Sequence, residues 1–372
     1  MNSSNHMRAM RVHEPSGRFR LDTIPRPTLL RPTDVLVDVK ASGVVPNLRN
    51  VMSHYGERSY LTVPDLPAIY GLDTAGVVTE VGSAVTGIAP GDRVYINPGR
   101  SCGSCHACRS GEWTNCVAYT FQGYFGFGPR SKQIYEQYPY GGFSEFATAP
   151  ADGLVKLPPA VSFEQAARFG YLGTAYSGLR KAGISSGKTL LISGASGTLG
   201  LGAVQIARAM GAVKILCVAR NPELLERVRQ LDPQRIRTFA HGNGDLGAWA
   251  REETDGVGVD AVLDAIGPGA SHQVTLDCIK ALRRGGRLVE VGAMSDPLPL
   301  NLHEMMCSQL SVIGSLWFSV AEGQDLAYMA AAGTLDLNIF EHHSYALEQA
   351  NEALADAEQR KGGFVNVVIV QQ

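Results

Sequence analysis

The stretch Thr189-Leu-Leu-Ile-Ser-Gly-Ala-Ser-Gly-Thr-Leu-Gly200 decides the fold of this chain. It begins with a short apolar run typical of a buried strand and continues into a turn that contains three glycines. A segment with helical spacing follows over 200–210, and a second apolar strand is predicted over 214–219. A strand, a glycine-rich turn, a helix and another strand in this order predict the first unit of a parallel sheet.

The alternation of helices and strands continues toward the C-terminus. A helix is predicted over 222–231, and further strands are predicted over 260–264 and 287–291. Short connections between such elements favour a doubly wound parallel sheet with helices on both faces. The expected fold class is therefore α/β, and this sheet domain, which begins with a helical segment at 163–182, is expected to span 161–311.

The residues on either side of this domain have a different character. Short β-branched runs such as 34–40 and 76–82 are separated by Gly and Pro, which predicts a partly open β-barrel. Beyond residue 310, a strand over 310–316, a helix over 347–359 and a final strand over 364–370 are expected. The barrel domain is thus expected to comprise 1–160 and 312–372, with the parallel-sheet domain inserted between these two parts.

Length and composition limit the possible functions. A chain of 372 residues exceeds what one hydrophobic core usually supports, so two domains are expected. The net charge is −2, from 33 basic and 35 acidic residues, which argues against a nucleic-acid partner or a polybasic membrane surface. No apolar stretch is long enough to span a membrane and the first residues are polar. We therefore expect a cytoplasmic protein that acts on a small molecule.

The glycine-rich turn lies where a dinucleotide fold binds the pyrophosphate of its cofactor. Glycines let the backbone approach the phosphates, and the helix that follows offers free N–H groups and the positive end of its dipole. The alternative is a turn that only permits close packing of the strand and the helix. The predicted cofactor site comprises Thr174, Gly194, Ser196, Gly197, Thr198, Leu199, Gly200, Ala219, Arg220, Ile266, Gly267, Val291, Gly292 and Ala293.

The end of the second strand indicates which dinucleotide binds. An acidic residue there would bind the ribose hydroxyls, whereas a small residue followed by an Arg makes room for a 2′-phosphate. The sequence reads Val218-Ala219-Arg220-Asn221, with no carboxylate before Glu223. This favours NADP(H) over NAD(H). Binding of NAD(H) stays open, because Arg220 would then only stack on the adenine or face solvent.

A cluster of cysteines predicts a metal site. Cys102, Cys105, Cys108 and Cys116 are separated by two, two and seven residues within a lobe of about 98–120. Four thiolates satisfy a tetrahedral zinc and leave no position for water, so this zinc would be structural. The alternative is four free thiols, which the regular spacing disfavours.

These features together resemble the zinc-containing alcohol dehydrogenase branch of the medium-chain dehydrogenase/reductase superfamily. The resemblance runs from about Arg8 to Val370, and its most specific motifs are the cysteine lobe and the glycine pattern that ends in Gly91-Asp-Arg-Val94. It implies a GroES-like barrel with an inserted Rossmann domain. It also implies a homodimer, or a tetramer built from it, because strand Ser311–Trp317 falls where this family pairs strands across a two-fold axis.

The departures from the family pattern concern the catalytic zinc. The family holds this zinc with a Cys, a His and a further Cys or acidic residue, and the matching positions here read Val45, Leu72 and Tyr171. Aliphatic side chains cannot bind a metal, so we expect one structural zinc per chain and no catalytic zinc.

Without a metal to polarise a carbonyl, the chemistry is expected to use protein groups. The candidates are Tyr171, Asn47, where the family often has a proton-relaying Ser or Thr, and Asp73 beside Leu72. Each has a structural alternative, such as filling the volume of the metal. The resemblance to quinone, enone and iminium reductases favours an NADPH-dependent reductase of a conjugated C=C or C=N bond. An alcohol dehydrogenase that uses protein acids, a non-redox lyase or hydratase, and a binding protein stay open.

Other residues near the expected cleft are less informative. The aromatic run 119–127 is expected either to line an apolar substrate cleft or to pack the cysteine lobe onto the barrel. His54, Tyr55 and His303 are single polar residues for which core or surface roles are favoured.

Overall fold

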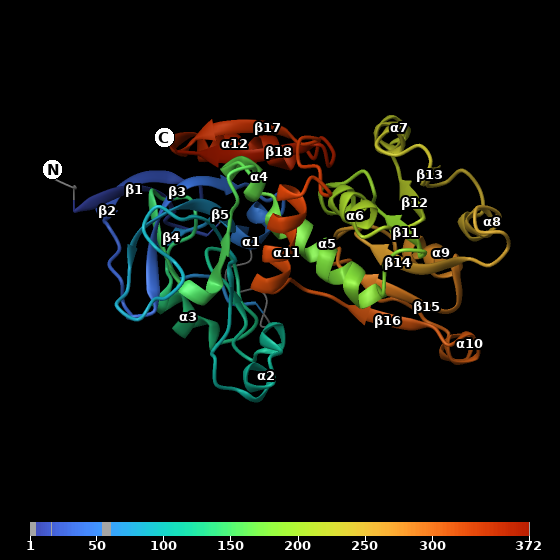
Figure 1. The fold of residues 1–372 in the computed structure, drawn as a ribbon, viewed down its shortest axis with the longest axis horizontal. Coiled ribbons are helices and arrows are strands. Elements are labelled where there is room, and N and C mark those ends of the chain that lie inside the picture. Colours follow the sequence, from blue (N-terminus) through green and yellow to red (C-terminus); the bar gives the residue numbers. More distant parts are fainter. Residues whose placement is uncertain (1–4, 16, 54–60, 372) are drawn as a thin grey trace.

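The computed structural model describes residues 5–15, 17–53 and 61–371, which form two sheet-containing halves (Figure 1). One half contains the ends of the described chain and consists mainly of antiparallel strands, and the other is a parallel sheet with its helices. The long helix α5 (Phe169–Ala182) runs between them. The predicted fold class, a barrel-like domain and a doubly wound parallel sheet, is confirmed.

The parallel sheet has six strands in the order β13-β12-β11-β14-β15-β16. Every neighbouring pair is parallel, and the strands in the middle are almost completely buried because helices cover both faces. The strands are β11 (Thr189–Ser193), β12 (Lys214–Ala219), β13 (Ile236–Ala240), β14 (Val259–Asp264), β15 (Leu282–Glu290) and β16 (Ser311–Gly314). Its helices besides α5 are α6 (Thr198–Ala209), α7 (Pro222–Gln230), α8 (Leu246–Glu252), α9 (His272–Ile279) and α10 (Leu302–Ser308).

The antiparallel half is built around a seven-stranded sheet in which β3 is central. Its strands are β3 (Asp34–Gly43), β5 (Asp73–Val81), β6 (Arg93–Ile96), β9 (Phe146–Pro150), β10 (Leu154–Lys156), β17 (Glu341–Ala346) and β18 (Val365–Val370). A second sheet joins β1 (His6–Val12), β2 (Arg20–Pro25) and β4 (Ala68–Ile69), and a short ribbon joins β7 (Gly99–Arg100) to β8 (Thr120–Phe121).

Short helices complete this half. They are α1 (Leu48–Ser53), α2 (His106–Arg109), α3 (Ser131–Gln137), α4 (Phe163–Ala166), α11 (Val320–Ala331) and α12 (Ala350–Glu358), with single 3-10 turns at η1 (Trp113–Asn115), η2 (Ala151–Gly153) and η3 (Leu347–Gln349). None of the helices in the described ranges is long and apolar enough to cross a membrane.

The C-terminal strand β18 pairs with a strand from the N-terminal part of the chain. Strand β18 pairs antiparallel with β3, with Val368 opposite Gly43. The strands of the parallel sheet lie between β10 and β17 in sequence, so the chain leaves the antiparallel half once and returns to it. Because β16 hydrogen-bonds to β15, we propose a domain boundary after Gly314, a few residues later than the sequence suggested.

The helix expected over 163–182 is interrupted. Helix α4 starts at a capping box formed by Ser162 and Gln165 and ends at Ala166, and α5 begins only at Phe169. The break coincides with Arg168, whose side chain is drawn into the interior by backbone carbonyls described below. Helical periodicity alone does not reveal this break, because the apolar pattern continues across it.

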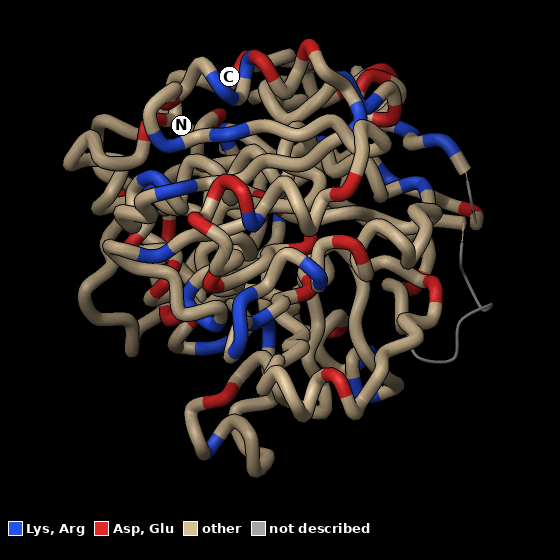
Figure 2. The backbone as a smooth tube through the Cα atoms, turned by 90° about the vertical axis from the view of Figure 1, so that its right-hand side faces the viewer, with Lys and Arg blue, Asp and Glu red and all other residues tan. Residues whose placement is uncertain are grey.

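Charged residues are mixed over the side of the molecule that carries the parallel sheet. Basic and acidic segments alternate along the backbone in this view (Figure 2). This distribution agrees with the net charge of −2.

The outer edge of the parallel sheet exposes apolar side chains. Strand β16 pairs with β15 on one side, and Val312 and Leu316 at this edge are 41% and 42% exposed. The neighbouring helix α10 exposes Leu302 and Met306 even more. An apolar edge strand of this kind favours pairing with another strand, and a second copy of the chain related by a two-fold axis would provide one.

We therefore propose that the chain forms a homodimer through β16. Light scattering at micromolar concentration should give at least twice the chain mass of 39.8 kDa. Val312→Lys should shift the population toward monomer, because a charge at the pairing edge would have to be buried. Val257→Lys, at an exposed apolar position outside this edge, is the matched control and should leave the mass unchanged. A monomeric wild-type chain would contradict the proposal.

Candidate functional site

The turn between β11 and α6 has the geometry of a phosphate-binding loop. Gly194 has a φ of +75°, and its N–H donates to the carbonyl of Val218 on the neighbouring strand at 2.9 Å. A Cβ at Gly200 would lie 2.1 Å from the carbonyl oxygen of Gly194, so no side chain fits there. Gly197 is the N-cap of α6 and provides no capping side chain, which leaves the first N–H groups of the helix for an anion.

The loops after the next strands meet the phosphate loop. A Cβ added at Gly292 would lie 2.0 Å from the carbonyl oxygen of Ile266. A Cβ added at Gly194 would lie 3.4 Å from the side chain of Ile266. The predicted cofactor residues that follow β14 and β15 therefore lie together at the carboxyl edge of the sheet, beside the glycine-rich turn. A pyrophosphate and its attached riboses fit this arrangement.

Sequence reasoning missed an acidic residue at this edge. Oε1 of Glu290 accepts hydrogen bonds from the N–H groups of Gly292 and Ala293, both at 2.8 Å, and this fixes the turn in which Ala293 has a φ of +63°. Burial and the neighbouring Asp264 raise the pKa of Glu290 to about 7. A single Glu at the end of a strand such as β15 gives no distinctive sequence signal.

The end of β12 presents a free cation. Ala219 is almost buried and Arg220 is exposed, while the side chain of Asn221 caps α7 by accepting from the N–H of Leu224 at 3.0 Å. No ion pair of Arg220 is found within the described part of the chain. The guanidinium is thus available to a ligand at the strand end.

Of the positions that would hold a catalytic zinc, Val45 and Tyr171 line a cleft between the halves, whereas Leu72 lines a separate small pocket. Val45 and Leu72 are buried and offer no ligand atom. The cleft that Val45 lines also contains Asp73, Tyr171 and Thr198, the first residue of α6. Of the residues expected to act on the substrate, Tyr171 and Asp73 therefore share one cleft with the start of the phosphate-loop helix, whereas the exposed Asn47 does not line it.

Asp73 is one of two buried acids that line this cleft, the other being Asp356. Its Oδ1 accepts from the hydroxyl of Tyr95 at 2.7 Å, and the backbone N–H of Gly170 also donates to it. Burial raises the pKa of Asp73 to about 7, although these hydrogen bonds and the charge of Arg168 oppose the rise. The carboxyl group can therefore take up or release a proton near neutral pH.

Tyr171, Asn47 and an unexpected tyrosine surround the same region. Burial raises the pKa of Tyr171 well above its ordinary value, so the hydroxyl keeps its proton and can donate a hydrogen bond. The buried Tyr124, from the aromatic run, is hydrogen-bonded to Asn47 and lies within electrostatic range of Tyr171 and Asp73. Sequence reasoning had treated the run as a group and did not single out Tyr124.

Other rings of the aromatic run pack against one another and against Trp317. Phe121 is buried, and its ring lies 5.4 Å from that of Phe125 and 4.8 Å from that of Trp317, between ring centroids. These edge contacts pack the segment after the cysteine lobe against the residues after β16. His303 is exposed on α10, and His54 and Tyr55 lie outside the described residues.

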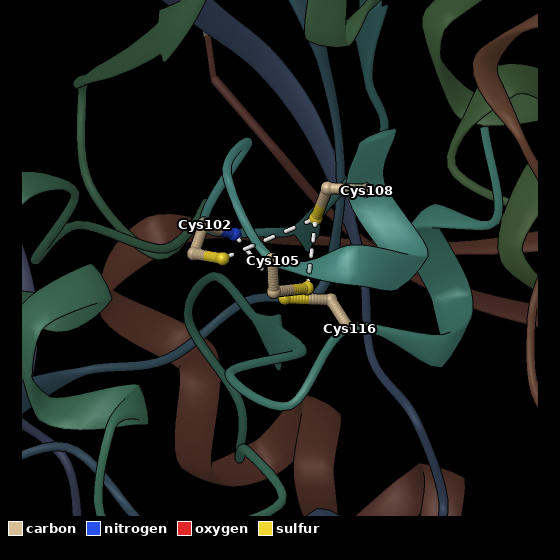
Figure 3. A group of neighbouring side chains, drawn as sticks. All are labelled: Cys102, Cys105, Cys108 and Cys116. Atoms are coloured by element: carbon tan, nitrogen blue, oxygen red, sulfur yellow. Dashed lines mark hydrogen bonds between the residues drawn. The ribbon is translucent and has the colours of Figure 1, made fainter. Parts of the chain in front are cut away.

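The four cysteines converge on one point. Figure 3 shows their side chains directed toward one another, and all four sulfurs lie within 4.8 Å of each other. The Sγ atoms of Cys102 and Cys108 are 4.0 Å apart, and those of Cys105 and Cys108 are 3.5 Å apart. Sulfurs bound to one tetrahedral zinc at about 2.3 Å are roughly 3.8 Å apart, so the cluster fits this ion.

Among the described residues, this is the single group of three or more Cys, His, Asp or Glu side chains with such a geometry. The backbone N–H groups of Cys102 and Ala118 each donate to the Sγ of Cys116 at 3.3 Å, which fixes the position of this sulfur. Four sulfurs complete the coordination, so the ion would hold the lobe together and take no part in the chemistry.

We expect one zinc per chain by elemental analysis. Cys102→Ser should lose this zinc and lower the thermal stability of the lobe, because metal binding and folding are coupled. Cys307→Ser is the control, since Cys307 is exposed and outside the cluster, and it should retain the metal. Two tightly bound zinc ions per chain would contradict the assignment.

Comparison with known proteins supports this description. Residues 31–159 match the family model "Alcohol dehydrogenase GroES-like domain", and residues 198–332 match "Zinc-binding dehydrogenase". An alcohol dehydrogenase from Geobacillus stearothermophilus is 33% identical over 81% of this chain and 82% of its own length. A probable D-xylulose reductase A from Aspergillus clavatus is 28% identical over 94% of each chain.

Solved structures show the same likeness. The crystal structure of AibC superimposes with a TM-score of 0.84 at 27% identity, covering 99% of this chain and 96% of that one. Alcohol dehydrogenase TADH from Thermus sp. ATN1 superimposes with a TM-score of 0.82 at 27% identity, covering 98% and 100%. The two alcohol dehydrogenases and the xylulose reductase are named for an alcohol or a ketose, and none of these relatives is named for the conjugated substrate that the sequence interpretation preferred. The chain belongs to the medium-chain dehydrogenase/reductase superfamily, in its zinc-type alcohol dehydrogenase-like branch, and is an oxidoreductase.

Proposed function

We propose that the protein interconverts an alcohol and a carbonyl compound with a nicotinamide cofactor, and that protein groups replace the catalytic zinc. The observation that carries the proposal is the shared cleft, in which Thr198 at the start of the phosphate-loop helix lies with Tyr171 and Asp73. The relatives named alcohol dehydrogenase and D-xylulose reductase support this substrate class.

A bound nicotinamide would donate or accept the hydride. Tyr171 holds the reacting oxygen by donating a hydrogen bond, since burial keeps its hydroxyl protonated. Asp73, with a pKa of about 7, exchanges the proton that balances the reaction, while Tyr95 and the N–H of Gly170 hold its carboxyl group in place. Val45 covers part of the cleft wall with an apolar side chain and limits the access of water.

A second candidate is the reduction of a conjugated C=C or C=N bond. It is favoured by the aliphatic side chains of Val45 and Leu72, because a conjugated substrate delocalises the charge left by the hydride and needs less help from a Lewis acid. Assays with a sugar ketone, a simple alcohol, an enone and a quinone, followed by the absorbance of the reduced nicotinamide, separate the two candidates. A lyase or hydratase would convert its substrate without any change in this absorbance.

The proposed cofactor is NADP(H). The exposed guanidinium of Arg220 stands at the end of β12 with no acidic residue at the position before it, so it would meet the 2′-phosphate. The Asn221 side chain does not compete for this phosphate, because it already caps α7.

Arg220→Ala should weaken NADPH binding roughly tenfold or more and leave NADH binding nearly unchanged, because only NADPH carries the 2′-phosphate. Titration of cofactor fluorescence measures both affinities. The matched control is Arg229→Ala, which removes an exposed cation that is paired with Glu226 on α7. An equal loss for both cofactors would place Arg220 away from the phosphate.

Tyr171→Phe should lower kcat and kcat/KM together, by roughly tenfold to a thousandfold, on the substrate that the assays identify. The ring and its packing remain, so the thermal unfolding temperature should change little. Tyr176→Phe on the same helix removes a hydroxyl that is bonded to Asp325 at 3.2 Å and serves as the control. Unchanged kinetics in Tyr171→Phe would show that the ring only fills space.

A further inference from the structure

Arg168 is a buried cation without a carboxylate partner. Its side chain is among the largest that are fully buried, at 2% exposure, and it precedes α5 at the break after α4. Within the described ranges the chain has no ion pair that includes Arg168. Taking a guanidinium out of water is costly unless hydrogen bonds or a later partner compensate for the lost hydration.

Backbone carbonyls hold this guanidinium in a fixed orientation. Its Nη1 donates to the carbonyl of Val365 at 3.0 Å, and its Nη2 donates to those of Thr198 and Gly363 at 3.2 and 2.6 Å. Its Nε, although buried, has no hydrogen-bond partner. Carbonyl dipoles orient the cation but leave its net charge in place, and the pKa of about 10 keeps it protonated at neutral pH even though burial lowers this pKa.

The charge is directed at the groups that would handle the substrate oxygen. Arg168 lines the same cleft as Tyr171 and Asp73, and its guanidinium carbon lies 5.4 Å from the centroid of the Tyr171 ring. The ring of Phe340 packs on the cation as well, at 4.7 Å, which excludes water from its surroundings. A positive charge in so dry a site acts on its neighbours more strongly than one in solvent.

The other charges of the cleft do not replace it. The carboxylate of Asp356 is hydrogen-bonded to Lys361 at 2.7 Å and to His343 at 2.6 Å. The charges of Asp356 and Lys361 therefore largely cancel. Arg360 also lies within electrostatic range of Tyr171 and lowers its pKa, but the charge of Asp73 raises the same pKa. Arg168 is thus the buried and immobile cation beside Tyr171.

We infer that Arg168 is a positioning residue that stabilises negative charge on an oxygen bound at Tyr171, through its fixed guanidinium charge. This inference rests on the proposed function, since an alkoxide is the charge that develops when a carbonyl accepts hydride. In the oxidative direction the same charge favours loss of the alcohol proton. Because Arg168 also donates to the carbonyls of Thr198 and Gly363, the position of its charge is fixed relative to the phosphate loop.

The test compares Arg168→Lys with Arg168→Met. Both variants lose the planar fork and most of its carbonyl bonds, so cofactor affinity and thermal stability should fall in both. Only the Lys variant keeps the positive charge. We expect kcat to be at least tenfold higher for Arg168→Lys than for Arg168→Met, with little difference in KM.

A double-mutant cycle locates the effect. In a Tyr171→Phe background, the difference in kcat between the Lys and Met variants should vanish, because the charge acts through the oxygen that Tyr171 holds. Equal kcat values for the two variants, or a difference that persists without the Tyr171 hydroxyl, would overturn the inference.

A binding measurement separates this inference from the proposed function. Acetate, as a small oxyanion, should bind to the whole chain in calorimetry, at least tenfold more weakly in Arg168→Met than in Arg168→Lys, and more weakly in Tyr171→Phe. Arg180→Met removes an exposed cation of α5 that pairs with Glu322 and should not change the affinity. Acetate binding that is absent, or equal in the Lys and Met variants, overturns the role of Arg168 whatever the substrate is. Charge-dependent binding without alcohol turnover overturns only the proposed function.

Discussion

The antiparallel pairing of β18 with β3 is the constraint on which the rest of the arrangement depends. It returns the end of the chain to the first half and sets the segment before β18 against the phosphate loop, where the N–H of Gly363 donates to the carbonyl of Ser196 at 2.8 Å. A Cβ at Gly363 would lie 2.4 Å from the carbonyl oxygen of Gly197, so the approach requires glycine. The two halves are thus joined at the loop that would hold the cofactor, and Arg168 completes the junction with bonds to both sides.

The two kinds of metal position that the family pattern implies place different demands on the fold. The cysteine lobe is a short segment with little apolar core of its own, so a zinc bound by four thiolates would supply the energy that orders it. The catalytic position lies in a cleft that is already built by strands and by α5, so the fold does not need a metal there. Val45 lines this cleft with a buried apolar side chain, and Leu72 is buried beside a neighbouring pocket.

The fold could be predicted from the sequence because its strongest signals are local. The glycines at 194, 197 and 200, the apolar strands around them and the cysteine spacing each require a particular backbone, and the structure has that backbone. The cleft was less accessible to prediction. Arg168 lies within an apolar helical pattern that gives no sign of its buried carbonyl partners, which come from residues about 30 and 195 positions away. Tyr124 also owes its place to a contact distant in sequence, its hydrogen bond with Asn47, and such contacts leave no periodicity.

The junction between Gly363 and the phosphate loop also links two events that occur in different halves of the molecule. Any ligand that orders the loop makes local opening of the attached C-terminal segment less favourable, because the bonds from Arg168 and the N–H of Gly363 have to break when that segment detaches. Occupation of the loop should then slow amide hydrogen exchange along β18, although this strand pairs with β3 and β17 in the other half and is not part of the six-stranded parallel sheet. Exchange along β18 would thereby report, from the other half of the molecule, whether the loop is occupied.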